Sequence, residues 1–173
     1  MTWAGANAWT ATLNANQYAG HNDWRLPTLN PSDTRCESGT GDDRFGFGCT
    51  GGELSHLFVT ELGNTAIQSV LTQTGDTAEQ IDNLVLFSNV QSYGYWSGTE
   101  WAPNPIVVWS LRTQAGFQDY GPKSNSLSAV AVRPGDVAAR ASTTQITDIP
   151  KCSKSSNCKK SIRRIFYRNK YLK

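Results

Sequence analysis

The chain has 173 residues, 38% hydrophobic and 17% charged, which is long enough for one domain with a sizeable core. The low charged share and the six Trp, six Tyr and six Phe are typical of a loop-rich secreted domain and argue against a cytosolic helical enzyme. The net charge of +2 is the sum of two oppositely charged parts of the chain. No apolar run follows Met1 and none is long enough to cross a bilayer, so we expect no membrane span. The protein is then either cytosolic, or this sequence begins after a signal peptide.

The charge is unevenly distributed along the chain. Residues 1–136 contain six basic and 13 acidic residues, a net charge of −7, whereas residues 137–173 contain ten basic residues and one acidic residue. We therefore expect an acidic domain over residues 1–137 and a disordered basic tail over residues 138–173. Cys152 and Cys158 in the tail lack the further ligands of a zinc site. Nucleic acid is not expected as a partner, because no recognised binding module accompanies the basic charge.

Two elements are predicted before residue 29. The Ala-rich residues 3–15 predict a helix with Thr2 as its N-cap. Asp-Trp-Arg-Leu-Pro-Thr at residues 23–28 predicts a short extended segment that the proline ends. Trp24 and Leu26 would share one face of this segment, and Arg25 would point the other way, toward water or a carboxylate.

A glycine-rich loop is predicted over residues 29–52, and Cys36 and Cys49 bracket most of it. A disulfide between these cysteines would stabilise an exported protein by roughly 3 kcal/mol in the chain-entropy model, whereas in a reducing cytosol both would be free thiols. Thr50 and Glu53 have the spacing of a capping box at the start of a second helix. The apolar positions of that helix recur at helical intervals, and Gly63 would end it.

The second half of the chain predicts a sheet. Residues 64–83 are polar and predict a loop with one helical turn. Short apolar and aromatic segments separated by Gly, Pro and Asn predict antiparallel strands at residues 93–101, 106–112, 116–121 and 127–133. With two helices before these strands, the fold class is α+β, two helices packed on a small antiparallel sheet with long loops.

Six short motifs occur in one order along residues 1–136. They are Met-Thr-Trp-Ala at 1–4, Asp-Trp-Arg-Leu-Pro-Thr at 23–28, Glu-Leu-Ser-His-Leu-Phe at 53–58, Glu-Leu-Gly-Asn at 61–64, Tyr-Trp-Ser-Gly-Thr-Glu at 95–100 and Ala-Val-Arg-Pro-Gly-Asp at 131–136. In this order they resemble the Lcl C-terminal domain family, a bacterial extracellular domain of largely unassigned function.

The resemblance implies a C-type lectin-like fold, export to the cell surface or medium, and a role in binding or adhesion. It also implies a signal peptide and a first strand before the helix at residues 3–15, and a C-terminal sorting anchor. None of these three is found in the chain, so we expect the first strand to be missing and the sheet to have an uncovered edge.

A sugar site is expected in the second half of the chain. Aromatic faces bind pyranose rings, and amides and carboxylates bind their hydroxyls. Strand alternation predicts that Trp96 and Trp109 belong to the core. The candidate ligand-binding residues are Trp101, Asn104, Gln118, Asp119 and Tyr120.

Metal and sulfate recognition are not expected at this site. Ala-Pro-Asn-Pro at residues 102–105 resembles the calcium-binding Glu-Pro-Asn loop of C-type lectins, but Ala102 replaces its carboxylate. Calcium needs about six to eight oxygen ligands, so we predict no metal and no other cofactor. The resemblance also implies sulfated polysaccharides, which fit poorly with a domain of charge −7.

Two alternatives to glycan binding are considered. The domain could be a protein–protein interaction module of a bacterial cell surface, which the sequence does not distinguish from a glycan-binding module. It could also be an oxidase similar to formylglycine-generating enzymes, which use a cysteine pair. Cys36 and Cys49 lie far from the predicted strands, and no other catalytic motif is present, so we expect a protein without enzymatic activity.

Overall fold

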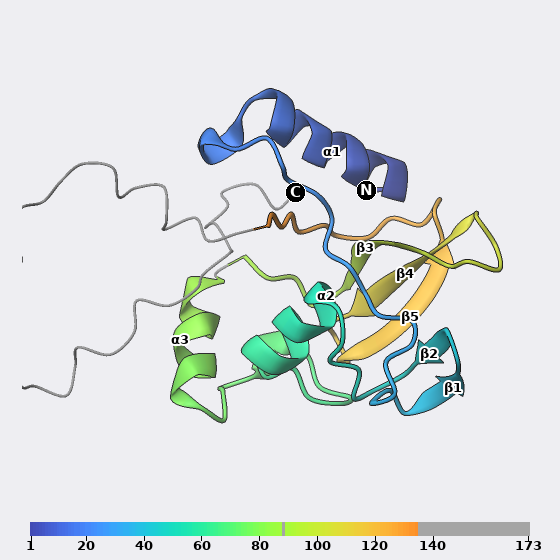
Figure 1. The fold of residues 1–173 in the computed structure, drawn as a ribbon. Helices are drawn as coiled ribbons and strands as arrows, with labels where there is room; N and C mark the ends of the chain where they lie inside the picture. Colours follow the sequence, from blue (N-terminus) through green and yellow to red (C-terminus); the bar gives the residue numbers. More distant parts are fainter. Residues whose placement is uncertain (88, 135–173) are drawn as a thin grey trace, which may run out of the picture.

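Three antiparallel strands form the central sheet of the protein, in the order β3-β4-β5 (Figure 1). They are β3 (Gly94–Glu100), β4 (Val107–Arg112) and β5 (Phe117–Pro122), which confirms three of the four predicted strands. The computed structural model describes residues 1–87 and 89–134, so the predicted basic tail lies outside the described residues. The class is α+β, as expected.

The fourth predicted strand, residues 127–133, does not join the sheet as a strand. This segment is extended but makes only two isolated bridges, from Ser128 to Tyr95 of β3 and from Val132 to Arg25. It runs from β3 to the Trp24 segment, and therefore does not pair continuously with either of them. Ser128 also covers the outer edge of β3, with Trp96 N donating to Ser128 O at 3.0 Å. The uncovered edge that we expected is thus covered on β3 by a segment from the end of the domain.

The first predicted helix is confirmed as α1 (Trp3–Ala15), with the Thr2 hydroxyl accepting from Gly5 N as its N-cap. The predicted second helix is α2 (Glu53–Ser55), which continues as the π-helical turn η2 (His56–Glu61). The other described elements are the 3-10 turns η1 (Tyr18–Gly20) and η3 (Val70–Thr72), and the hairpin β1 (Ser38–Thr40) and β2 (Asp43–Phe45).

Two details of the helices differ from the sequence prediction. The capping box is wrong, because Gly52 is the N-cap of α2 and the Glu53 carboxylate is bonded to Arg25 and Thr28 instead. Residues 64–83 contain more helix than one turn, since α3 (Ala78–Leu86) begins there with Thr77 as its N-cap. Leu84, Val85 and Leu86 of this helix lie beyond residue 83, so residues 64–83 alone contain too few apolar positions to indicate it.

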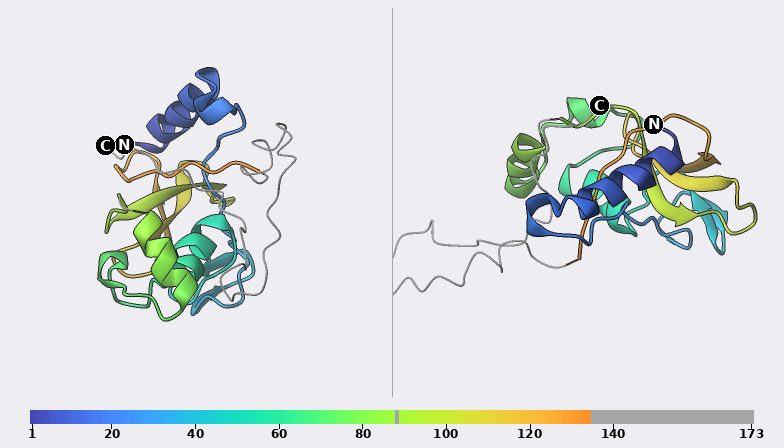
Figure 2. Two further views of the ribbon diagram at one scale, coloured as in Figure 1. Left: turned by 90° about the vertical axis from the view of Figure 1, so that its left-hand side faces the viewer. Right: turned by 90° about the horizontal axis from the view of Figure 1, so that it is seen from above.

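The sheet has a hydrophobic core on each face. On one face, Tyr95, Trp109 and Leu111 pack against α2 and η2. On the other face, Trp96 and Val108 pack under α1. Trp96 and Trp109 are both fully buried, as strand alternation predicted. Figure 2 shows the resulting layers, with α1 on one side of the sheet and α2 and α3 on the other.

The Trp24 segment connects the layers of the domain. Trp24 and Leu26 are buried, and Arg25 points the other way, as predicted. The Arg25 guanidinium donates to both oxygens of Glu53, at 2.6 and 2.7 Å. These bonds and the hydrogen bond from Thr28 N–H lower the pKa of Glu53. Partial burial acts in the opposite direction, but the pKa stays below its usual value. The carboxylate toward which Arg25 was expected to point is therefore that of Glu53, the first residue of α2.

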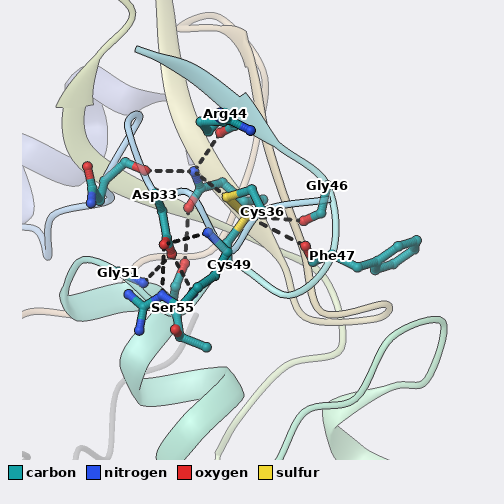
Figure 3. The surroundings of a disulfide bond; sticks show 12 residues. Asp33, Cys36, Arg44, Gly46, Phe47, Cys49, Gly51 and Ser55 are labelled. Atoms are coloured by element: carbon teal, nitrogen blue, oxygen red, sulfur yellow. Dashed lines mark hydrogen bonds and ion pairs between the residues drawn. A yellow bond between two sulfur atoms is a disulfide. The ribbon is translucent and has the colours of Figure 1, made fainter. Parts of the chain in front are cut away.

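The predicted disulfide between Cys36 and Cys49 is present, and it closes the loop that carries the β1–β2 hairpin (Figure 3). Next to it lies Asp33, whose side chain is 3% exposed. Burial raises the pKa of Asp33, but hydrogen bonds from the Arg35 side chain and from the backbone of Gly51, Arg35 and Thr50 outweigh burial and lower the pKa to about 2. The ionised carboxylate thus holds the two ends of the disulfide loop together.

Gln118 of β5 connects this loop to the sheet. Its side chain is fully buried, and its Nε2 donates to Asn30 O at 3.1 Å and Arg44 O at 2.9 Å. Its Oε1 accepts from the Ser55 hydroxyl of α2 at 3.1 Å. The backbone N–H and C=O of Gln118 also pair with Gly46, so one residue joins the disulfide loop, α2 and the sheet.

Replacing Gln118 by Leu should therefore destabilise the protein strongly. The substitution leaves two partly buried carbonyls and the buried Ser55 hydroxyl without their partner, which costs about 2–4 kcal/mol in the free energy of unfolding. Urea denaturation measures the change. Gln114→Leu is the matched control at an exposed position of the same hairpin, and its effect should stay within about 0.5 kcal/mol. Equal effects of the two substitutions would refute this role of Gln118.

Asp33→Asn should change how stability depends on pH. The folded pKa of Asp33 is about 2, against 3.8 for an ordinary Asp, so the ionised carboxylate stabilises the protein fully above about pH 4 and loses its contribution as the pH falls toward 2. We expect Asp33→Asn to lower the unfolding free energy by about 2 kcal/mol at pH 7 and by almost nothing at pH 2. Denaturation at both pH values tests this, with exposed Asp76→Asn as the control. A deficit of Asp33→Asn that persists at pH 2 would contradict the prediction.

Candidate ligand-binding site

The five predicted ligand-binding residues do not form one site, because three of them alternate along β5. Gln118 and Tyr120 face the core that contains Trp109, whereas Asp119 faces the opposite side of the sheet, next to Ser110. Gln118 is fully buried and its amide is bonded inside the protein, so it is not available to a ligand. Asp119 is half-buried and forms an ion pair with Arg112.

Trp101 and Tyr120 stack on each other. Their ring centroids are 4.7 Å apart with an angle of 9° between the planes, and Trp101 Nε1 donates to Asp43 Oδ1 at 3.1 Å. Tyr120 also packs edge-on against Trp109, 4.9 Å away. Burial, and then the negative charges of Asp43 and Asp119, raise the pKa of Tyr120. Both ring contacts of Tyr120 are therefore made inside the protein. Tyr120 covers one face of the Trp101 ring and leaves the other face free of this stacking.

Asn104 lies in the turn between β3 and β4. Its Oδ1 accepts from Ile106 N at 3.1 Å, and its backbone N–H donates to Trp101 O at 3.0 Å. This is the local side chain–backbone bond typical of Asn in turns, so its oxygen is used for the turn itself. Asn104 therefore shapes the loop beside Trp101 and offers at most its amide nitrogen to a ligand.

A pocket of about 210 Å³ lies on the side of the sheet that α1 partly covers. It takes residues from all three strands and from the segment after β5. Its lining consists of Tyr93, Gly94, Trp96, Ser110, Arg112, Gln114, Tyr120, Gly121, Asn125 and Leu127. Its volume is below the range typical of drug-sized ligands, so it fits a small ligand or one ring of a larger one.

Two glycines belong to the lining of this pocket. A Cβ atom at Gly121 would come within 3.2 Å of the Asn125 amide, and one at Gly94 would come within 2.8 Å of Leu127. Each strand thus lacks a side chain at one position on this face. Leu127 and the Asn125 amide approach the strands at these positions, so both become part of the pocket lining.

The polar groups of the pocket are amides, hydroxyls and one ion pair. Gln114 and Asn125 are exposed, and Tyr93 is 53% exposed beside them. Arg112 is the one charged residue of the lining, and Asp119 neutralises it from the neighbouring strand. The pocket therefore offers donors, acceptors and an aromatic ring without a strong net charge.

Tyr93, Arg112, Gln114 and Asn125 were not among the predicted ligand-binding residues. Of the predicted residues, Tyr120 is part of the lining, and Asp119 belongs to the site through its ion pair with Arg112. The strand pattern contains a usable signal, because Gly94 and Gly121 interrupt two aromatic strands on the same face. The signal becomes apparent only when the register of β3, β4 and β5 is known.

The described part of the chain contains no group of three or more His, Cys, Asp or Glu that could hold a metal ion. Within residues 1–87 and 89–134 there is likewise no helix long and apolar enough to cross a membrane. Cys36 and Cys49 are 5% and 1% exposed and bonded to each other, which is typical of a structural disulfide.

Comparison with known proteins identifies the family. No curated protein and no solved structure matches the chain. The model of one family, the Lcl C-terminal domain, matches residues 1–133, which include nearly all the described residues. Because this match covers more than half of the chain, the chain belongs to the Lcl C-terminal domain family.

Proposed function

We propose that this domain is an exported, non-catalytic binding module that recognises one sugar unit of a surface glycan in the pocket on the β3-β4-β5 sheet. The observation that carries the proposal is the convergence of an exposed aromatic ring, Tyr93, with two exposed amides, Gln114 and Asn125, around a small hollow. Aromatic rings bind the apolar faces of pyranoses, and planar polar groups bind their hydroxyls.

The Arg112–Asp119 pair extends the same chemistry. The guanidinium can donate to a sugar hydroxyl while the carboxylate accepts from a neighbouring one. Because the two charges neutralise each other, a neutral sugar is favoured over a sulfated one. Asp119 is the one carboxylate beside the pocket, and calcium needs about six to eight oxygens, so we propose binding without a metal.

Export is supported by the disulfide. Cys36 and Cys49 are joined across the loop that carries the β1–β2 hairpin, and such bonds persist in oxidising compartments. The α+β arrangement is compatible with the C-type lectin-like fold that the resemblance implies. A binding role also agrees with the origin of the pocket residues, which strands and loops of one scaffold bring together.

Filling the pocket should abolish glycan binding. Gly121→Val adds a branched side chain on the pocket face without backbone strain, because Gly121 does not have a positive φ, and its Cβ would already come within 3.2 Å of the Asn125 amide. Tyr93→Ser removes the exposed aromatic ring. A glycan array probed with the full chain should give a saccharide signal that survives EDTA, and each variant should weaken it by about tenfold or more.

Ile106→Ser is the matched control, because Ile106 is 65% exposed and does not line the pocket. It should bind like the original protein, and urea denaturation of all variants verifies that they are folded. A blank array with folded protein would direct the search to protein partners instead. A signal that disappears with EDTA, or that Gly121→Val leaves intact, would refute the proposed site.

A further inference from the structure

Helix α3 is attached to the domain with its polar side inward. Asn83 is 5% exposed, and its Nδ2 donates to the Glu61 carbonyl at 3.1 Å and to its carboxylate at 2.9 Å. Gln80 Nε2 donates to Thr60 O at 3.0 Å. Leu84 is the one residue of α3 that joins the core beside η2, and it is only partly buried. A surface helix normally does the reverse and buries its apolar stripe.

The apolar side of α3 faces away from the domain. Ile81 is 50% exposed, Val85 is 78% exposed and Leu86 is 43% exposed. Ile81 and Val85 are four residues apart and are therefore neighbours on one face of the helix. Figure 1 shows α3 at the margin of the described fold, with α2 and η2 on one side and no described element on the other. Ile81 lies close to Gly75 just before the helix, and the three apolar side chains still remain largely exposed among the described residues.

Acidic residues surround these apolar side chains. Glu79 and Asp82 are exposed on the same outward arc as Val85 and Leu86, and Asp76 precedes the helix. None of these three carboxylates forms an ion pair with a described residue. Five of the six described Lys and Arg residues are already bonded to other carboxylates, namely Arg25, Arg35, Arg112, Lys123 and Arg133. A partner that supplies both apolar and basic groups would complement this face.

We propose that the outward face of α3 binds the C-terminal segment of the same chain, residues 159–173. That segment contains seven Lys and Arg, no acidic residue, and the apolar side chains Ile162, Ile165, Phe166 and Leu172. Its composition is complementary to a face with Ile81, Val85 and Leu86 among carboxylates. A second copy of α3 would bring like charges together, and an anionic membrane would be repelled, so both fit this face less well.

The chain is long enough for this contact. Between Pro134 and Lys159, 25 residue steps can span up to about 80 Å, whereas a domain of this size is about 40 Å across. A tethered segment is present at an effective concentration of about 1 mM, so even a weak contact is populated. The proposal does not depend on the glycan site.

Zero-length carbodiimide cross-linking of the full chain tests the proposal, because it joins only carboxylates and amines that are in contact. We expect mass spectrometry to identify links from Glu79 or Asp82 to lysines of residues 159–173, and few links from Asp42 or Asp43 of the β1–β2 hairpin. The double variant Ile81→Ser/Val85→Ser should lower the yield of the α3 links about tenfold, since it removes apolar contacts and leaves every charge in place. Ile106→Ser, at an equally exposed position elsewhere, should not lower it.

A second variant, Arg163→Glu/Arg164→Glu, changes the segment and leaves α3 untouched, and it should cause the same loss. Mixing isotopically labelled and unlabelled chains distinguishes contact within one chain from contact between copies. Mixed-isotope links in place of links within one chain would overturn the intramolecular contact. Absence of α3 links, or α3 links that are no more frequent than those of Asp42 and Asp43 or that survive Ile81→Ser/Val85→Ser, would overturn the docking itself.

Discussion

The buried amide of Gln118 is the interaction on which the arrangement of the domain depends. A side-chain amide without partners is costly in a core, so it must meet donors and acceptors in a fixed geometry. Here it meets the carbonyls of Asn30 and Arg44 and the hydroxyl of Ser55, which come from the disulfide loop and from α2. The orientation of Gln118 also determines which side chains of β5 face the core and which face the pocket. With Gln118 and Tyr120 turned inward, Asp119 must turn toward Arg112 and the pocket.

Local patterns in the sequence predicted the elements that depend on local interactions. The α1 helix follows from its Ala content and the Thr2 cap, and the three strands follow from alternating apolar and aromatic residues between turns. The capping box failed because Arg25, 28 residues earlier in the sequence, binds the Glu53 carboxylate. Nothing near Glu53 in the sequence could reveal that competition.

The candidate site was predictable only in part, for a related reason. Alternation places Gln118 and Tyr120 on one face of β5 and Asp119 on the other, but it does not say which face is buried. The usual assumption that amides are exposed would turn Gln118 outward, whereas the disulfide loop supplies enough polar groups to bury it. The pocket is still less visible in sequence, since its shape depends on how Leu127 and Asn125 approach Gly94 and Gly121 once the strands are in register.

The two proposed binding surfaces lie on opposite sides of the sheet. The pocket is on the side of Trp96 and α1, whereas α3 packs beside η2 on the side of Trp109 (Figure 2). They also differ in chemistry, since the pocket is small and nearly neutral and the α3 face is acidic and apolar. A sugar in the pocket therefore does not compete sterically with a basic segment on α3. Both could be occupied in one molecule, and coupling between them would have to pass through the sheet that Gln118 anchors.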